Sequence, residues 1–508
     1  MSFRVLIRRA GSAASTAASP CWRYSSTMPL RAKILNPRSA VRAQHMSSSA
    51  VRAVPTELDT DEPQDVLFNT SYGLRTIELN RPEKHNALDG SMIRKIFPRL
   101  VEWEKSDMAN VIVMKGAGDQ AFCAGGDVAT LATQNMEDLE GERKSVEYFA
   151  LEYQLDHYIA TYQKPYIAFM DGFTMGGGVG LSIHAPFRIA TEKTVFAMPE
   201  TTIGFFPDVG ASFFLPRLSG SVGTYLALTS SRLLGANVFY SGIATHYLHS
   251  TSLPNLESRL AELRFKDYDG IEDRLAIIEM TIEEYATGLP HDVPILLGGE
   301  LRKAIDRCFD KNTIDDIINA LKKEQGPTKS WAETTLETLH KRSPTAVHVA
   351  LKQMRIGRDW SITETFQREH QIAAKFMKHP DFNEGVSALL LSKEKPRPVP
   401  KWQPASLEDI QPDSHITDPF FSLSNGPSKL ELVTNRDYSE YPYESFGVPL
   451  EKDVEALVRH SGLSRHAICE EFVRKKKGRQ GINAIVGEIL ARKTIVNDEG
   501  KAEWIYEG

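Results

Sequence analysis

Apolar runs in the first half of the chain are short and are separated by stretches of mixed polarity. Residues 111–114, Val-Ile-Val-Met, form a continuous apolar run that predicts a buried strand, and residues 76–80 predict a second strand. Between residues 256 and 391 the apolar positions recur at helical spacing instead, most clearly in 314–324 and 345–356. The pattern predicts an α/β portion followed by a mainly helical portion.

The end of the chain has a pattern of its own. Residues 449–460, 464–477 and 482–492 are amphipathic at helical spacing, and Ser464 is a suitable N-cap for the second of these helices. Residues 494–506 predict a hairpin that turns at 497–500. Three helices and a hairpin predict a small C-terminal module with a winged-helix-like arrangement.

Glycine clusters follow the predicted strands. Gly125 and Gly126 come shortly after the strand at 111–114, and Gly176, Gly177 and Gly178 form a triplet further along. Because glycine has no Cβ, a ligand oxygen can approach the backbone N–H groups closely. An α/β fold places its ligands just beyond such strands, and adjacent free amides can stabilise an oxyanion.

Two acids follow the glycine triplet, eight positions apart. Glu200 and Asp208 are each preceded by a proline that fixes the local chain. Taken alone, Glu200 fits an acid at the start of a helix and Asp208 fits a turn residue. Beside the glycine clusters they fit better as general acid–base groups of a site for acyl chemistry.

Other side chains near these motifs have simpler interpretations. His184 lies in an apolar helical run and is predicted to be a core histidine, whereas His85 and His246 are predicted to lie in a loop and on the surface. The four cysteines show no paired spacing, and nothing around Cys123 indicates an activated thiolate. We expect no metal site and no disulfide.

Several motifs together resemble the crotonase (enoyl-CoA hydratase/isomerase) superfamily, and residues 175–182 and 196–217 resemble its 3-hydroxyisobutyryl-CoA hydrolase branch. The likeness covers roughly residues 65–405. The motifs are Asn80-Arg-Pro, Asn86-Ala-Leu88, Phe122-Cys-Ala-Gly-Gly-Asp127, Lys164-Pro, Asp171-Gly172, Gly176-Gly-Gly178 and Pro199-Glu200.

The resemblance implies an α/β fold with defined parts. Residues 65–270 are expected to form the crotonase spiral of β-β-α repeats, and residues 271–392 a helical region that covers the active site. The proline-rich segment 393–424 is expected to be a stiff linker. Residues 425–508 form an extension beyond the usual end of this branch.

The resemblance also implies where a CoA thioester binds. The oxyanion hole is expected at the N–H groups of Gly126, or Gly125 one position earlier, and of Gly177. In relatives, the segments that match 84–87 and 124–127 hold the CoA moiety. The CoA-binding candidates within these segments are Lys84, Ala87, Ala124 and Asp127.

The acids distinguish between reactions. Hydratases of the superfamily use two glutamates; one is present as Glu200, but the position of the other is Gly180. Asp208 stands where hydratases carry glycine, and Glu152 matches a further acid that the hydrolases place at the substrate. The resemblance therefore implies hydrolysis, with Glu152, Gly177, Glu200 and Asp208 around the acyl group.

Two points of chemistry stay open at this stage. Glu200 is expected either to activate water or to attack the carbonyl and form an anhydride. The acyl group is expected to be 3-hydroxyisobutyryl or 3-hydroxypropionyl. No cofactor is expected, because CoA is part of the substrate.

Composition limits the possible settings. A chain of 508 residues suggests more than one compact unit. A net charge of −6 argues against overall attraction to nucleic acid, and no apolar run approaches the roughly 20 residues that span a bilayer. Superfamily members commonly form trimers or hexamers, so a homo-oligomer is possible here.

The N-terminal segment 1–55 contains no Asp or Glu, and arginine recurs in it among serine and alanine. This composition is typical of a mitochondrial transit peptide and predicts a matrix protein. The alternative is a disordered basic arm.

The extension carries a basic cluster at 474–477 and Arg479. It is interpreted either as a solvated helix end or as a contact to RNA or an acidic partner. Some fungal members of the hydrolase branch are components of the mitochondrial ribosome small subunit, and this extension resembles theirs. Ribosomal proteins and rRNA are therefore the alternative partners.

Overall fold

The computed structural model describes residues 54–266, 268–410, 415–422 and 429–505. The predicted transit peptide therefore lies outside the described residues, apart from its last two positions. No helix among the described residues is long and apolar enough to cross a membrane.

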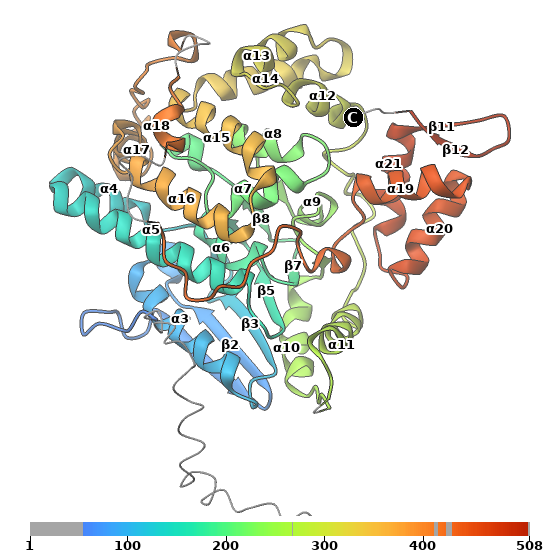
Figure 1. The fold of residues 1–508 in the computed structure, drawn as a ribbon, viewed down its shortest axis with the longest axis horizontal. Helices are drawn as coiled ribbons and strands as arrows, with labels where there is room; N and C mark the ends of the chain where they lie inside the picture. The colour runs from blue at the N-terminus through green and yellow to red at the C-terminus, as the bar shows by residue number, and fades with distance from the viewer. Residues whose placement is uncertain (1–53, 267, 411–414, 423–428, 506–508) are drawn as a thin grey trace, which may run out of the picture. The chain divides into compact units, whose positions relative to one another are not determined.

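The larger sheet has six strands in the order β1-β2-β3-β5-β7-β10 (Figure 1). The strands from β2 to β10 pair in parallel, and β1 forms an antiparallel hairpin with β2. The bounds are β1 (Val66–Ser71), β2 (Leu74–Leu79), β3 (Val111–Gly116), β5 (Tyr166–Met170), β7 (Phe187–Ala190) and β10 (His246–Tyr247). The strands predicted at 76–80 and 111–114 are β2 and β3.

A second sheet has four short strands in the order β4-β6-β8-β9. Its strands are β4 (Ala121–Cys123), β6 (Phe173–Met175), β8 (Val195–Ala197) and β9 (Leu233–Leu234). The chain visits the two sheets alternately, from β3 to β4, from β5 to β6 and from β7 to β8. Helices separate these pairs, so the predicted spiral of β-β-α repeats is confirmed.

The helices of this spiral follow the strand pairs. They are α3 (Gly90–Lys105), α4 (Val128–Glu137), α5 (Leu139–Ala160), α6 (Gly177–Ile183), α7 (Ala211–Phe214), α8 (Val222–Thr229), α9 (Ala236–Tyr240) and α10 (Leu253–Ala261). Helix α5 is preceded by Asp138, which acts as its N-cap by accepting a hydrogen bond from the N–H of Gly141.

The helical region predicted after residue 270 is present. Its helices are α11 (Ile271–Glu283), α12 (Gly299–Phe309), α13 (Ile314–Lys323), α14 (Lys329–His340), α15 (Pro344–Ile356), α16 (Ile362–Phe376), α17 (Pro380–Val386) and α18 (Asp418–Phe421). Thr313, Ser343 and Ser361 are side-chain N-caps of α13, α15 and α16. Helix α16 lies alongside α5, and Figure 1 shows both on the same side of the strands.

The proline-rich segment after α17 packs on the core. The side chain of Trp402 is buried, and its Nε1 donates to the carbonyl of Lys341 at 3.2 Å. The N–H of Gln403 donates to Asp381 at 2.8 Å. The segment is thus anchored to the core at Trp402 and Gln403, whereas residues 393–397 and Val399 are exposed. Its stiffness stays a prediction.

The first described part of the extension, residues 429–447, crosses the core as a strap (Figure 1). Arg436 forms hydrogen bonds of 2.7 and 2.9 Å to the carboxylate of Glu104. The carbonyl of Tyr438 accepts a hydrogen bond from the start of α16, and the hydroxyl of Tyr441 donates to Ala185. The strap is therefore part of the folded core.

The predicted C-terminal module is present as three helices and a hairpin. Its elements are α19 (Glu451–Ser461), α20 (Arg465–Lys475), α21 (Ile482–Lys493), β11 (Thr494–Val496) and β12 (Ala502–Trp504). Ser464 caps α20 by accepting a hydrogen bond from the N–H of Ala467 at 3.3 Å. Whether the arrangement is a winged helix stays a prediction.

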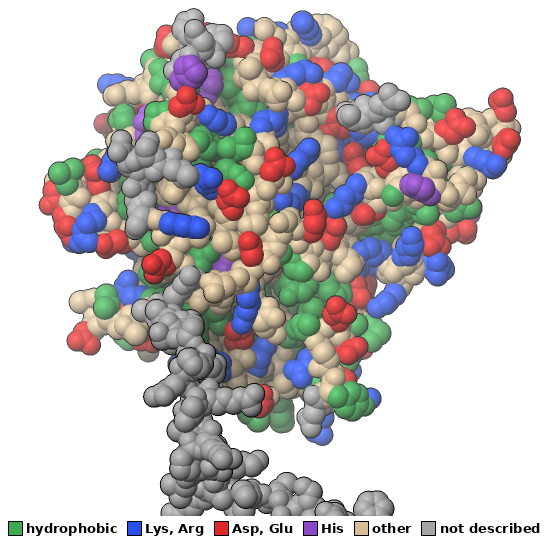
Figure 2. Space-filling model, viewed as in Figure 1, with side chains coloured by type: hydrophobic (Ala, Val, Ile, Leu, Met, Phe, Trp, Pro, Cys, Tyr) green, Lys and Arg blue, Asp and Glu red, His purple; other side chains and the backbone are tan. Residues whose placement is uncertain are grey.

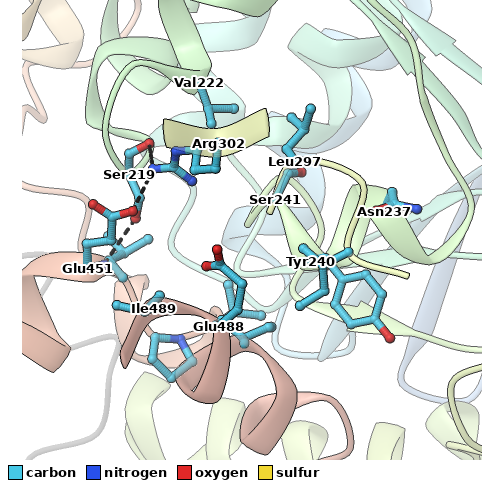
Figure 3. Close-up of a pocket in the computed structure, with 15 residues that line it drawn as sticks. Ser219, Val222, Asn237, Tyr240, Ser241, Leu297, Arg302, Glu451, Glu488 and Ile489 are labelled. Atoms are coloured by element: carbon cyan, nitrogen blue, oxygen red, sulfur yellow. Dashed lines mark hydrogen bonds and ion pairs between the residues drawn. The ribbon is translucent and has the colours of Figure 1, made fainter. Parts of the chain in front are cut away.

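A buried ion-pair network around Glu451 joins the module to the core. Glu451 contacts Arg302 of α12 at 2.7 Å and Arg492 of α21 at 2.5 Å. Figure 3 shows Glu451, Arg302 and Ser219 joined at the edge of a cavity of about 40 Å³ between the core and the module. Removing one member of such a network leaves an uncompensated buried charge, so the network specifies how the module docks.

The basic cluster of the extension is used mainly within the chain. Lys476 donates to the carbonyls of Ser445 and Gly447 at 2.6 and 2.7 Å, and Arg479 and Lys477 pair with Glu279. Figure 2 shows acidic and basic side chains interspersed over the viewed face of the module. Lys476 and Arg479 are therefore held within the fold. Arg474, Lys475 and Lys477 are more than half exposed, so this part of the cluster still fits either a solvated helix end or a partner contact.

The position of His246 differs from the surface position that the sequence predicted. Its side chain on β10 is buried, not on the surface, and its Nε2 lies 3.3 Å from Glu283. Arg479 reaches the same place by donating to the carbonyl of Thr245. Burial and the charge of Arg479 hold the pKa of His246 well below its ordinary value. The C-terminal module covers this sheet edge, and a local sequence pattern does not reveal such cover.

Candidate active site

Two glycine amides come together between the spiral's loops. Gly126 follows β4, and Gly177 begins α6 directly after β6. A Cβ built on Gly177 would lie 3.3 Å from the backbone nitrogen of Gly126. Within the described part of the chain, neither amide donates a hydrogen bond. The structure thus brings the two predicted amides close together, and the choice between Gly126 and Gly125 stays a prediction.

The predicted CoA-binding segments lie side by side. The N–H of Ala124 donates to the carbonyl of His85 at 3.0 Å, and that of Ala87 donates to the carbonyl of Lys84 at 3.0 Å. The carboxylate of Asp127 pairs with Lys84 at 3.1 Å and also accepts hydrogen bonds at the start of α4. Lys84, Ala87, Ala124 and Asp127 are therefore neighbours, with the Lys84 side chain 51% exposed.

Helix α5 presents a stripe of polar side chains to the glycines. Tyr148, Glu152 and Asp156 are four residues apart, which places them on one helix face. A Cβ built on Gly126 would lie 2.9 Å from the Tyr148 hydroxyl. A Cβ on Gly177 would lie 2.5 Å from Glu152 Oε1, and one on Gly180 would lie 2.6 Å from Asp156 Oδ2. Because each glycine lacks a Cβ, a polar side chain of α5 can pack directly against its backbone.

Glu200 reaches the same place from another loop. It begins the short helix η3 (Glu200–Ile203), and its Oε1 would lie 3.2 Å from a Cβ on Gly176. Its Oε2 is buried and has no hydrogen-bond partner among the described residues. Tyr153 of α5 donates a hydrogen bond of 2.6 Å to Asp208. Glu152 and Glu200 thus lie beside the glycine loops. Asp208 is joined to α5 through Tyr153 and is near enough for its charge to act on both glutamates.

The turn that carries Asp208 has a strained backbone. Val209 has a φ of +53°, a conformation that costs energy for a β-branched residue. The ring of His184 lies 3.0 Å from the carbonyl oxygen of Val209. Burial lowers the pKa of His184 to about 4, so the neutral ring donates from Nε2 at neutral pH. His184 is the core histidine predicted, and it also holds the turn.

Helices α15 and α16 fix the rest of this turn. Glu369 accepts hydrogen bonds from the N–H groups of Gly210 and Ser212 at 2.7 and 2.9 Å. Gln353 donates to the carbonyl of Pro207. These contacts come from the helical region, so that region positions Asp208 as well as packing on the core.

Burial and mutual repulsion dominate the electrostatics of the acids. Burial raises the pKa of Glu152 and of Glu200 well above the ordinary range, and the charge of Asp208 adds to both shifts. Burial also raises the pKa of Asp208, to about 7, although the hydrogen bond from Tyr153 opposes the shift. These shifts favour the protonated forms of Glu152 and Glu200, whereas the pKa of Asp208 near 7 leaves it partly ionised at neutral pH.

Sequence reasoning missed several residues at the site. Tyr148 and Asp156 could have been found from their spacing of four residues on either side of Glu152. Tyr153, Gln353 and Glu369 gave no such local signal, because they reach Asp208 or its turn across the tertiary fold. Cys123 lies beside the glycine pair, and burial raises the pKa of its thiol to about 12. It is therefore inert, as expected.

Known proteins resemble this chain over most of its length. The family described as enoyl-CoA hydratase/isomerase matches residues 74–421. Small ribosomal subunit protein mS47 of Neurospora crassa is 56% identical over 492 residues, which cover 96% of each chain. Mitochondrial 3-hydroxyisobutyryl-CoA hydrolase of Gallus gallus is 42% identical over 371 residues, which cover 73% of this chain and 92% of the enzyme. The crystal structure of a carnitinyl-CoA dehydratase from Mycobacterium thermoresistibile covers 72% of this chain and 98% of its own, at 31% identity and a TM-score of 0.62.

Proposed function

The chain belongs to the enoyl-CoA hydratase/isomerase family, and on that premise we propose that it hydrolyses 3-hydroxyisobutyryl-CoA to 3-hydroxyisobutyrate and CoA. This reaction is a step of valine breakdown. The likeness to 3-hydroxyisobutyryl-CoA hydrolase supports the hydrolytic reaction and the acyl group. A preference over 3-hydroxypropionyl-CoA is part of the same proposal.

One observation carries the proposal: two adjacent, free N–H groups lie beside buried acids. The N–H groups of Gly126 and Gly177 have no partner among the described residues, and Glu152 and Glu200 reach the same glycine loops. Such amides stabilise the oxyanion of a thioester under attack, and each donor is worth about 3–4 kcal/mol. The neighbouring carboxyl groups supply the proton transfers that hydrolysis requires.

In the proposed reaction, the thioester oxygen accepts hydrogen bonds from Gly126 and Gly177. A water molecule attacks the carbonyl carbon and transfers a proton to the ionised carboxylate of Asp208. Asp208 takes the role of base that the sequence suggested for Glu200, because burial raises the pKa of Glu200 well above the ordinary range. The tetrahedral intermediate then breaks its C–S bond, and Glu200 gives its proton to the departing thiolate of CoA. Thioester and water are thereby converted to carboxylic acid and thiol, and transfer of a proton from Asp208 to Glu200 restores both groups for the next turnover.

The alternative route begins with attack by Glu200 on the carbonyl and passes through an anhydride. It requires an ionised Glu200, because a protonated carboxyl group is a poor nucleophile. Burial and the charge of Asp208 raise the pKa of Glu200 and so favour attack by water in the free protein.

The CoA moiety is proposed to be held by Lys84, Ala87, Ala124 and Asp127. The reaction uses no other cofactor.

Release of free CoA from 3-hydroxyisobutyryl-CoA by the purified full chain tests this function. Glu200→Gln should lower kcat by about 10²–10⁴ because the variant cannot transfer a proton. Glu147→Gln is the matched control on the exposed side of α5, where Glu147 pairs with Arg143, and it should keep the full rate. A wild-type protein that releases no CoA from 3-hydroxyacyl-CoA thioesters would exclude the proposal.

We propose that the protein acts in mitochondria and, more specifically, in the matrix. The hydrolase from Gallus gallus is named as mitochondrial, and the acid-free segment 1–55 has the composition of a transit peptide. Fractionation of mitochondria into membrane and matrix should recover the protein in the matrix.

A second candidate function is a structural role in the mitochondrial small ribosomal subunit, in contact with its proteins and rRNA. The similarity to small ribosomal subunit protein mS47 spans nearly the whole chain, whereas the hydrolase covers less of it. The hairpin of the module also exposes Ile495 and Val496, which are 49% and 53% accessible. Exposed aliphatic side chains on a protruding hairpin suit a protein contact.

Sedimentation of a mitochondrial lysate tests the second function. The full chain should migrate with the small ribosomal subunit, and Val496→Asp should release it while hydrolysis continues. Leu67→Asp, which also places a charge at an exposed aliphatic position but on β1, should not release it. A wild-type chain that stays at the top of the gradient would exclude this role.

A further inference from the structure

The carboxyl group of Asp156 is the most isolated polar group of the site. Its side chain is fully buried, and both of its oxygens lack a hydrogen-bond partner among the described residues. Buried polar groups are nearly always hydrogen-bonded, and each one left unpaired costs free energy. The proposed chemistry gives Asp156 no task, so its two unpaired oxygens require an explanation.

Asp156 lies next to the part of the site that contains the oxyanion amides. It is one helical turn beyond Glu152 on α5 and faces Gly180, which is nearly one turn beyond Gly177 on α6. A Cβ on Gly180 would lie 2.6 and 2.8 Å from the two carboxyl oxygens. One helical turn advances about 5.4 Å. The 3-hydroxyl of an extended acyl chain lies at a comparable distance from its thioester oxygen.

The surroundings of Asp156 favour the protonated form of its carboxyl group. Burial raises its pKa well above the ordinary value, and the charges of Glu152, Asp208 and Glu369 raise it further. A neutral carboxyl group has both an O–H donor and a free acceptor oxygen. An alcohol also donates one hydrogen bond and accepts others. The two groups are therefore complementary, as in other apolar sites where a neutral acid donates a hydrogen bond.

We propose that Asp156 determines specificity by pairing with the 3-hydroxyl group of the acyl chain. This inference rests on the proposed hydrolysis and adds the residue that recognises the hydroxyl. Asp208 then remains free to accept the proton of the attacking water. A site built to hydrogen-bond a substrate hydroxyl can reject the analogue that lacks it by up to about 10⁴–10⁵-fold, because the buried partner is left unpaired.

The test compares 3-hydroxyisobutyryl-CoA with isobutyryl-CoA, which lacks only the hydroxyl group. The wild type should favour the hydroxylated substrate in kcat/KM. Asp156→Leu, of similar size but apolar, should lower kcat/KM for the hydroxylated substrate at least about 10-fold more than it lowers kcat/KM for isobutyryl-CoA. Asp156→Asn, which keeps a neutral donor and acceptor, should retain most of the preference.

A binding measurement separates this inference from the hydrolysis itself. Ketone analogues of both substrates, with CH₂ in place of the thioester sulfur, cannot be hydrolysed, and their Kd values are measurable by calorimetry. The wild type and Asp156→Asn should bind the hydroxylated analogue more tightly, and Asp156→Leu should lose that difference. Equal loss for both analogues, or an unchanged preference in Asp156→Leu, would overturn the assignment. Absent turnover with preserved discrimination would overturn the hydrolase function alone.

Discussion

The hydroxyl of Tyr153 donates a hydrogen bond of 2.6 Å to Oδ2 of Asp208 and so joins helix α5 to the turn beyond η3. Both side chains are buried. Burial raises the pKa of Asp208 to about 7, and this hydrogen bond opposes the rise because it stabilises the ionised form. Tyr153 therefore influences whether the proposed base is ionised at neutral pH.

Replacement of Tyr153 by Phe removes the hydroxyl and keeps the ring. The pKa of Asp208 should rise, and the acid limb of the kcat/KM profile should move upward by about one pH unit. Hydrolysis of 3-hydroxyisobutyryl-CoA measured from pH 5 to 9 gives the midpoint. An unmoved midpoint in the variant would mean that this hydrogen bond does not set the ionisation.

The wild-type rate should depend on pH through Asp208. The ionised carboxylate accepts the proton of water, so kcat/KM should fall as the pH drops below about 7. The descending limb should be lost or displaced in Asp208→Asn, whose residual rate is far lower. A wild-type rate that is constant between pH 5 and 8 is incompatible with this role.

The proton on Glu200 also links stability to pH. Because the pKa of Glu200 is raised in the folded state, its contribution to stability is complete below the ordinary pKa of 4.5 and is lost as the pH rises through the folded value. Glu200→Gln cannot ionise. Relative to the wild type, this variant should gain about 1–3 kcal/mol of stability between pH 4 and pH 8. Thermal unfolding at the two pH values measures the gain, and an identical difference in Tm at both would refute it.

The side chain of Asp156 fills the space beside Gly180. A Cβ on Gly180 would lie 2.6 Å from Asp156 Oδ2, so Gly180→Ala should destabilise the protein by about 1–3 kcal/mol. In the double variant, Asp156→Ala should remove most of that cost because the clash is gone. A double-mutant cycle on the unfolding free energies measures the coupling. Additive effects would show that the two residues do not compete for space.

The docking of the C-terminal module depends on Glu451. Glu451→Gln removes the carboxylate that Arg302 and Arg492 share. Because Arg302 keeps its pair with Asp306 and Arg492 keeps its pair with Glu488, the loss should cost about 1–3 kcal/mol of stability. Glu455→Gln on the same helix breaks only an exposed pair with Arg459 and should cost less than about 1 kcal/mol. Urea unfolding of both variants provides the comparison, and equal midpoints would argue against a structural role for the network.

Local sequence patterns predicted most elements of the fold. The strands β2 and β3, the helices α13 and α15, and the three helices and hairpin of the module lie where periodicity places them. Burial across the tertiary fold was not predictable in the same way. His246 resembled a surface residue, but Arg479, far along the chain, contacts the neighbouring backbone and helps to cover it.

The pairing partners of the basic cluster in the extension were also not predictable from the sequence. Its residues are adjacent in the sequence, which suggested one basic surface. In the structure Lys476 and Arg479 turn towards the strap and α11, where Glu279 pairs with Arg479 from a distant part of the sequence. Arg474 and Lys475 instead pair with Glu471 on their own helix. A charge pattern specifies which groups are present, whereas their partners depend on how the chain folds back.

By itself the sequence determined which groups are available for chemistry. Glycine pairs that free backbone amides, and acids held by prolines at Glu200 and Asp208, are local features that the order of residues encodes directly. Only the tertiary structure decided that the N–H groups of Gly126 and Gly177 are neighbours, and that Asp156 faces Gly180. Those relationships, and the pKa shifts that burial imposes, arise from packing between segments far apart in the chain. No local pattern encodes such distances.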